Sequence, residues 1–167
     1  MKPQVVVVGS FVQDLTWQCA AFPQAGETVV GTFVTGPGGK GSNQAVAAGR
    51  AGAPTLFVGA VGRDAFAGDA KKFYRTEGIG AHFVEKPALA TGTAGILVNA
   101  SGQNEIIVAL GANAALARRG LDARAVHLQA RLGNTDLERP ADPGIGKICL
   151  PFDTQFAKGI LARQFHL

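Results

Sequence analysis

A run of four consecutive valines, Val5–Val8, constrains the fold of this chain more than any other feature. An unbroken run of β-branched residues is typical of a strand buried on both faces, as in a parallel sheet, and predicts a strand over 4–9. Short apolar runs recur at 55–59 and 81–85, and 66–77 carries apolar residues at helical spacing. Strands that alternate with helices predict an α/β core.

Two further groups of segments predict a more exposed sheet beside this core. Residues 15–19 and 27–35 are rich in β-formers with partial alternation. Residues 93–99 and 104–110 flank a short polar segment, which is typical of a hairpin. We therefore expect an α/β core that carries a β-rich flap.

Composition and charge exclude several classes of protein. Hydrophobic residues make up 47% of the chain and charged residues 17%, which excludes a disordered polypeptide. No apolar run reaches the length of a membrane-spanning helix. The net charge is only +4, and adjacent cationic side chains occur only at Lys71-Lys72 and Arg118-Arg119. We therefore expect neither a nucleic-acid partner nor a membrane partner.

The cysteines and histidines suggest neither disulfides nor a metal. Cys19 and Cys149 are far apart, which is typical of a reduced, cytoplasmic protein. The histidines lack the spacing of metal ligands, so we assign no metal site; they are His82, His127 and His166.

A glycine-rich segment, 36–41, carries the strongest chemical signal. The alanine-rich stretch 44–49 follows it and predicts a helix capped by Ser42 or Asn43. Such a loop lets backbone N–H groups approach an oxygen-rich or anionic ligand. It also matches the spacing of a dinucleotide fingerprint, although that fingerprint normally follows the first strand. A tight turn into a packed helix is the purely structural alternative.

Several separated motifs, in order, resemble the ribokinase-like (PfkB) sugar kinase family. The resemblance covers about residues 4–130, and more weakly reaches about 142. The residues that carry it are 8–10 with Asp14, 23–28, 38–45, 47–53, 58–64, 91–92 with 96–99, and 111–116. It implies a ribokinase-like three-layer α/β core with a small β-sheet lid, truncated at the C-terminus.

The resemblance also implies a sugar site. The residues that would hold sugar hydroxyls are Asp14, Gly38, Gly39, Lys40 and Asn43, with Glu138 as a further acceptor. The residues that would form an apolar wall of the lid are Ala94, Ile96 and Val108. A carboxylate, an amide and backbone donors suit a polyol, although Asp14 alone would also fit a turn after a strand. Val12 stands where the family usually has asparagine, which leaves one hydroxyl of ribose without a partner.

The second half of the family's machinery is missing from the sequence. The family's Gly-Ala-Gly-Asp segment, which supplies the catalytic base, does not occur, so we assign no catalytic residue. ATP and Mg²⁺ are implied as cofactors of the family, but we do not expect this chain to bind them well. We expect a ribokinase-like region over 1–130, with lid strands at about 15–35 and 93–110. Over 131–167 we expect an irregular tail, as in a frameshifted or rearranged gene product.

These observations predict a protein descended from an ATP-dependent sugar kinase that retains the sugar-binding half and is inactive alone. The implied partners are a small-molecule sugar and a second copy bound through the lid, or self-association through uncovered apolar surface. A non-catalytic module that binds a sugar or a partner protein is one alternative. A dinucleotide-dependent oxidoreductase is the other.

Overall fold

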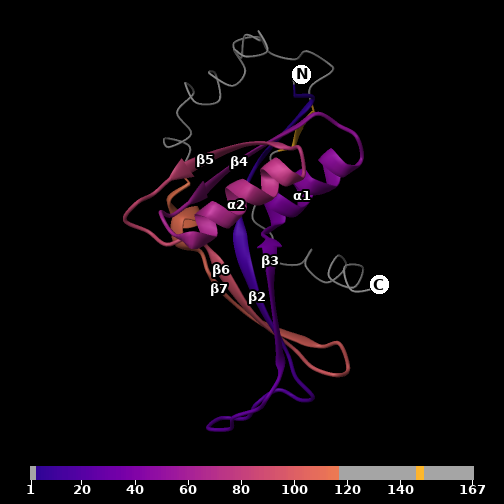
Figure 1. Ribbon diagram of the computed structural model, residues 1–167, viewed down its shortest axis with the longest axis vertical. Helices are drawn as coiled ribbons and strands as arrows, with labels where there is room; N and C mark the ends of the chain where they lie inside the picture. The colour runs from indigo at the N-terminus through magenta and orange to yellow at the C-terminus, as the bar shows by residue number, and fades with distance from the viewer. Residues whose placement is uncertain (1–2, 117–145, 149–167) are drawn as a thin grey trace.

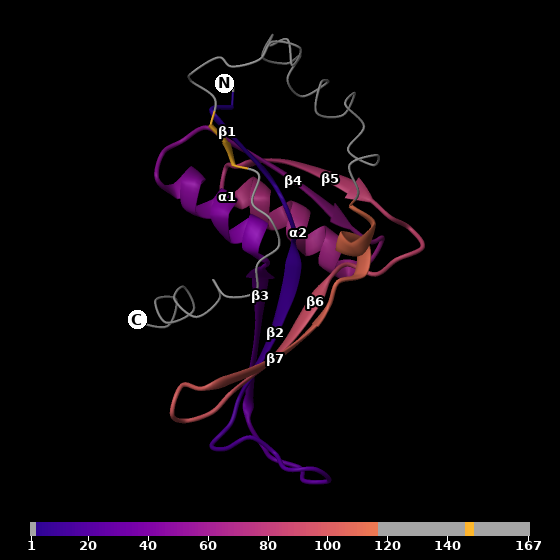
Figure 2. The same cartoon turned by 180° about the vertical axis from the view of Figure 1, so that it is seen from behind.

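The core sheet is parallel and contains the valine run as an interior strand (Figures 1 and 2). The computed structural model describes residues 3–116 and 146–148. Within them the core sheet has the order β5-β4-β1-β8. Its strands are β1 (Val5–Val8), β4 (Thr55–Val61), β5 (Gly80–Glu85) and β8 (Gly146–Ile148). β1 pairs with β4 on one edge and with β8 on the other; Val7 is buried and the other three valines are half-buried.

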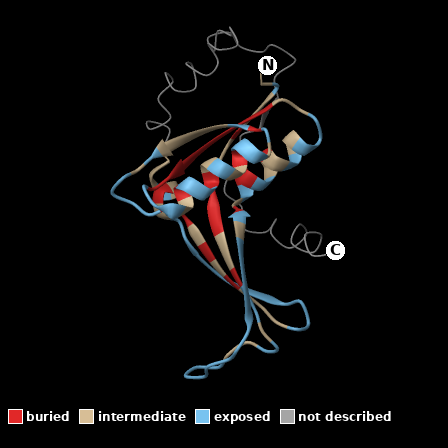
Figure 3. Cartoon of the chain, viewed as in Figure 1, coloured by how far each residue is buried: buried red, intermediate tan, exposed pale blue. Residues whose placement is uncertain are grey.

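A second sheet, here called the lid, extends from the core as a twisted arm (Figure 1). Its order is β3-β2-β6-β7, with β2 and β6 parallel and the outer pairs antiparallel. The strands are β2 (Val12–Gln18), β3 (Thr32–Gly38), β6 (Thr93–Val98) and β7 (Asn104–Ala109). Figure 3 shows that the arm is buried where it joins the core and exposed towards its hairpin tips. The expected flap is therefore present as a separate sheet.

Two helices cover one face of the core sheet, α1 (Lys40–Arg50) and α2 (Ala65–Thr76) (Figures 1 and 2). The other helical layer of the expected three-layer core is not among the described residues. A short 3-10 helix, η1 (Gly111–Ala115), follows the lid. No helix in the described ranges is long and apolar enough to cross a membrane.

An aromatic cluster joins the helices to the core sheet. Tyr74 of α2 stacks on Phe57 of β4, with ring centroids 4.9 Å apart, and both side chains are buried. The Tyr74 hydroxyl donates a hydrogen bond to Ser42 Oγ of α1 at 3.0 Å, so one contact connects both helices. Phe11 and Phe83 complete the cluster with edge-on rings. Burial of such side chains is the main source of stability at the centre of the fold.

Several element boundaries differ from the sequence prediction; β2 runs from Val12 to Gln18 rather than over 15–19, and β4 continues to Val61 rather than ending at 59. The predicted bounds of 27–35 are wrong, because β3 runs from Thr32 to Gly38 and Val30, 94% exposed, lies in the loop before it. β3 includes Pro37, which a strand tolerates here because β3 is at the edge of the lid. The predicted start of α1 near 44 is also wrong.

Helix α1 begins at Lys40, and Gly39 is its N-cap without a side-chain hydrogen bond. Ser42 and Asn43 therefore lie inside the helix rather than at its cap. The hydroxyl of Ser42 is used by Tyr74, and its N–H donates to the carbonyl of Ser10 at 3.1 Å. Within 131–167, where the sequence predicts an irregular tail, the described residues are those of β8, which ends at Ile148.

Candidate functional site

Glycines bring the start of α1 against the end of β1. A Cβ atom added at Gly41 would lie 2.7 Å from the Cα atom of Gly9, closer than real contacts allow. Gly39 has a φ of 95°, which side-chain-bearing residues rarely adopt. The N-terminus of α1 is thereby held at the carboxyl end of the parallel sheet, where ligands bind in open α/β folds.

Asp14 lies on the lid next to this helix start. It stands in a cross-strand row with Gly36, Ala94 and Val108, and directly paired residues project from the same face. A Cβ atom added at Gly38 would overlap the Asp14 carboxyl group, so glycine at 38 leaves room for that group. The structure thus brings Asp14 and Gly38 together, as the sequence predicts.

The carboxyl group of Asp14 is partly buried, and this changes its pKa and its need for hydrogen-bond donors. Burial raises the pKa of Asp14 from 3.8 to about 6. Within the described part of the chain, no side chain or amide donates a hydrogen bond to this carboxyl group. A partly buried carboxylate without donors is costly unless a ligand supplies them.

Lys40 and Asn43 both occupy the first turn of α1, directly after Gly38 and Gly39. Their spacing of three places them on one side of the helix, and both are exposed. The backbone N–H of Asn43 donates to the carbonyl of Gly39 at 2.9 Å. Its side chain is exposed, and its amide can both donate and accept hydrogen bonds.

The predicted apolar wall lies on the Asp14 face of the lid, but its members differ in burial. Ala94 and Ile96 are buried and pack with Val12 in a small cluster. Val108 pairs with Ala94 yet remains 50% exposed, because β7 is an edge strand. Val12, two residues before Asp14, presents a methyl-bearing surface on the same face. Glu138, the remaining candidate, lies outside the described residues.

The sequence alone gave no role to Asp64 and Thr91. The Asp64 carboxylate accepts the N–H of Ala67 at the start of α2 and both the N–H and the hydroxyl of Thr91, each of the latter at 2.7 Å. Burial opposes the ionisation of Asp64, but these hydrogen bonds outweigh it and lower its pKa. The pair ties the segment that enters β6 to the core. An aspartate three residues before a helical amide was the available signal.

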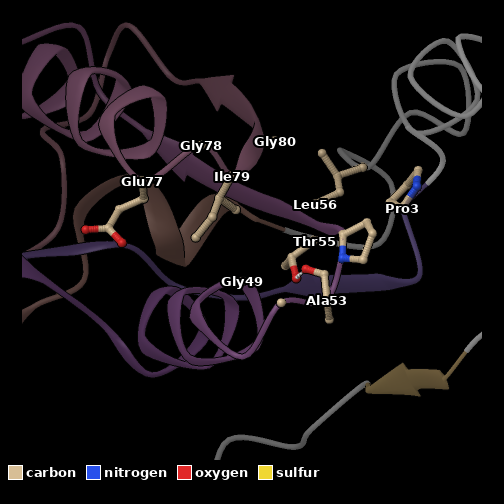
Figure 4. A pocket seen from close by; sticks show the side chains of 11 residues that line it. Pro3, Gly49, Ala53, Thr55, Leu56, Glu77, Gly78, Ile79 and Gly80 are labelled. Atoms are coloured by element: carbon tan, nitrogen blue, oxygen red, sulfur yellow. Dashed lines mark hydrogen bonds between the residues drawn. The ribbon is translucent and has the colours of Figure 1, made fainter.

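A surface pocket of about 500 Å³ lies away from Asp14 (Figure 4). It is lined by residues at the beginnings of β4 and β5 and at the end of α1, among them Gly49, Thr55 and Gly80. Glu77 borders it, but its carboxylate is paired with Arg50 at 2.7 Å. The pocket therefore adds nothing to the site at the carboxyl end of the sheet.

The described residues do not fit a metal. Across 3–116 and 146–148, no three His, Cys, Asp or Glu side chains gather as ligands would. The Mg²⁺ implied by the resemblance therefore has no set of ligands in this part of the chain, and we derive no step through it.

Comparison with known proteins identifies the family. The model of the pfkB family carbohydrate kinases matches residues 2–140. The chain is similar to ribokinase of Mus musculus, with 44% identity over 111 residues that cover 65% of this chain and 34% of that protein. The solved structure of ribokinase from Giardia lamblia is similar with a TM-score of 0.71 and 40% identity, covering 75% of this chain and 39% of that one.

A third similar protein is ribokinase of Arabidopsis thaliana, solved in complex with ribose and ATP. It has a TM-score of 0.59 and 37% identity, and the match covers 68% of this chain and 38% of that one. The chain spans roughly 34–39% of the length of these relatives. Because the family model matches most of the sequence and the fold agrees, the chain belongs to the pfkB family of carbohydrate kinases.

Proposed function

We propose that this chain binds a pentose sugar between the Asp14 face of the lid and the first turn of α1. The supporting observation is the Asp14 carboxyl group, which lies against Gly38 and receives no hydrogen bond from the described residues. Sugar hydroxyls would supply the missing donors, and the side-chain amide of Asn43 would both donate and accept. Val108, half-exposed on the same face, offers an apolar surface for the carbon face of the ring, whereas Ala94 and Ile96 are buried.

In this proposal, residues 1–130 form the sugar-binding region and the chain alone transfers no phosphoryl group at an enzymatic rate. Phosphoryl transfer depends on groups that position and neutralise the phosphates. The sequence lacks the Gly-Ala-Gly-Asp segment that carries the family's base. The matches cover only 34% and 38% of the similar ribokinases from Mus musculus and Arabidopsis thaliana.

Calorimetric titration of the full chain tests this function. We expect saturable binding of ribose or 2-deoxyribose and no heat with ATP or NAD⁺. Since Val12 offers no hydrogen bond on the Asp14 face, the deoxy sugar should bind at least as well as ribose. Binding of NAD⁺ without sugar would favour the oxidoreductase alternative. A coupled assay with ATP should give a turnover below about 1 per second, the lower end of the ordinary enzyme range.

We also propose that the opposite face of the lid binds a second copy of this chain. That face carries a cluster of partly exposed apolar side chains: Leu15, Trp17, Phe33, Leu97 and Ile107. Trp17 and Phe33 pack with ring centroids 5.1 Å apart and are 40% and 50% exposed, while Ile107 is 78% exposed. Exposed apolar patches of this kind mark interaction surfaces.

Sedimentation equilibrium at tens of micromolar tests the second copy. The unchanged chain should self-associate, and Ile107→Lys should shift it to the monomer because a charge would be buried in the contact. Val30→Lys is the matched control, since Val30 is 94% exposed but lies outside the paired strands, in the loop between β2 and β3. A monomeric unchanged chain, or equal dissociation by both variants, would contradict the proposal.

A further inference from the structure

The side chain of Asn113 makes three hydrogen bonds at the junction of core and lid. The N–H of Phe11 donates to Asn113 Oδ1 at 3.2 Å. Asn113 Nδ2 donates to the carbonyl of Phe11 at 2.7 Å and to the carbonyl of Leu110 at 3.0 Å. One side chain therefore holds the segment that enters β2 and the segment that leaves β7. These segments are about 100 residues apart in the sequence.

Phe11 is the point at which the chain leaves the core for the lid. Its side chain is fully buried in the core cluster, whereas Val12, the next residue, belongs to the apolar cluster of the lid. Asp14 follows two residues later on β2. Any rotation of the backbone at Phe11 would therefore be carried into the position of the Asp14 carboxylate relative to α1.

Neighbouring glycines keep space for this arrangement. A Cβ atom added at Gly92 would collide with Asn113 Nδ2 and lie 2.9 Å from the carbonyl oxygen of Leu110. Gly111 has a φ of 51°, and the N–H of Ala112 donates to the carbonyl of Ala90 at 2.7 Å. The segments at Phe11, Gly92 and Leu110, which each connect the core to the lid, thus meet at the Asn113 amide.

We propose that Asn113 is a positioning residue, which fixes β2 so that Asp14 faces the first turn of α1 and thereby sets the affinity for sugar. This inference rests on the proposed sugar-binding function. Asn113 need not touch the sugar, since it acts through the backbone of Phe11. Its amide is suited to the task because it accepts one hydrogen bond and donates two, and no charge is buried.

The test compares Asn113→Ala and Asn113→Asp with Asn99→Ala in the full chain. Asn113→Asp keeps the shape but replaces the Nδ2 donor with an oxygen that faces two carbonyls. Asn99 is the matched control: its Oδ1 accepts the N–H groups of Ser101 and Gln103 in the turn between β6 and β7, far from η1. Both Asn113 variants should bind 2-deoxyribose or ribose at least about tenfold more weakly, while Asn99→Ala stays within about twofold.

Amide hydrogen exchange supplies a readout that does not depend on sugar. In Asn113→Ala, exchange at the Phe11 amide should accelerate at least about tenfold. The Gly9 amide, which donates to the carbonyl of Val58 in the core, should be unchanged and so report that the core is intact. Asn113→Asp keeps the acceptor for the Phe11 N–H and loses only the two donors. In that variant the Phe11 amide should exchange as in the unchanged chain while the sugar affinity still falls, which keeps the inference open to test if the alanine variant does not fold.

The outcomes separate this inference from the sugar-binding function. If the unchanged chain binds sugar and both Asn113 variants bind it equally well, the positioning role is overturned and the function stands. If the unchanged chain binds no sugar, the function fails, and Asn113 is judged by the Phe11 amide and by the NMR titration of the Asp14 carboxyl. An unaltered exchange rate and an unaltered Asp14 titration in Asn113→Ala would then overturn the inference.

Discussion

Replacing Asp14 with asparagine should abolish pentose binding and, at neutral pH, make the folded protein more stable. The carboxylate is the acceptor in the proposed site, and loss of charge-assisted hydrogen bonds to two hydroxyls weakens binding by about 100-fold or more. The same carboxylate is partly buried without a described donor, which disfavours the charged form in the folded state. An isosteric neutral amide removes that penalty. Calorimetric titration and thermal melts measure the two effects.

The stability gain should depend on pH in a defined direction. Burial raises the pKa of Asp14 from 3.8 to about 6 in the folded protein. Between these values the folded state binds more protons than the unfolded state, so the free energy of unfolding falls as pH rises. Asp14→Asn should therefore match the unchanged chain below about pH 4 and exceed it by about 1 kcal/mol above pH 6, discounted because Asp14 is only partly buried. Sugar affinity of the unchanged chain should weaken below about pH 6, as the carboxylate is protonated.

Asp69→Asn is the matched control, since Asp69 is an exposed aspartate on α2. It should change neither the sugar affinity nor the melting temperature. If Asp14→Asn bound sugar as well as the unchanged chain does, Asp14 would not lie in the sugar site. A melting temperature below that of the unchanged chain at pH 7.5 would show that the carboxylate has a stabilising partner.

Local sequence pattern was sufficient for the elements but not for their ends. The valine run, the helix beginning near Phe66 and the hairpin around Gly102 follow from periodicity and turn residues, and all are present. The start of α1 was misplaced because Ser42 has a tertiary partner in Tyr74, which a capping rule cannot foresee. The start of β3 was misplaced because Val30 is β-forming yet lies beyond the last pair of the sheet.

In the candidate site, too, the sequence predicted some features and could not predict others. The motif around Gly38 and Lys40, together with Asp14, followed from the family resemblance, and the structure places them side by side at one end of the core. The sequence could not indicate that Asp14 would have a raised pKa, because that depends on strands that pair across about 80 residues of sequence. The role of Asn113 could not be predicted from the sequence either. Its importance lies in a contact with Phe11 that no local pattern encodes.

Gly39→Ala should cause the largest loss of stability of any single methyl addition at the site. Gly39 has a φ of 95°, where an L-residue other than glycine is strained by about 1–3 kcal/mol. The added Cβ atom would also lie 2.6 Å from the carbonyl oxygen of Ser10 and 2.9 Å from the amide nitrogen of Val12. Both are backbone atoms, so relief would require the helix start and the lid to separate. Chemical denaturation should show a loss of about 3–5 kcal/mol.

Gly36→Ala provides the matched control, because it adds the same methyl group three residues earlier, within β3. Its Cβ would meet nothing within 4 Å and its φ is not positive, so the change should cost less than about 1 kcal/mol. Since domains of this size are stable by only about 5–15 kcal/mol, Gly39→Ala should leave a chain with weakened or absent sugar binding, whereas Gly36→Ala keeps its fold. Equal stability of the two variants would mean that the start of α1 is not held against Ser10 and Val12, and the geometry proposed for the sugar site would lose its basis.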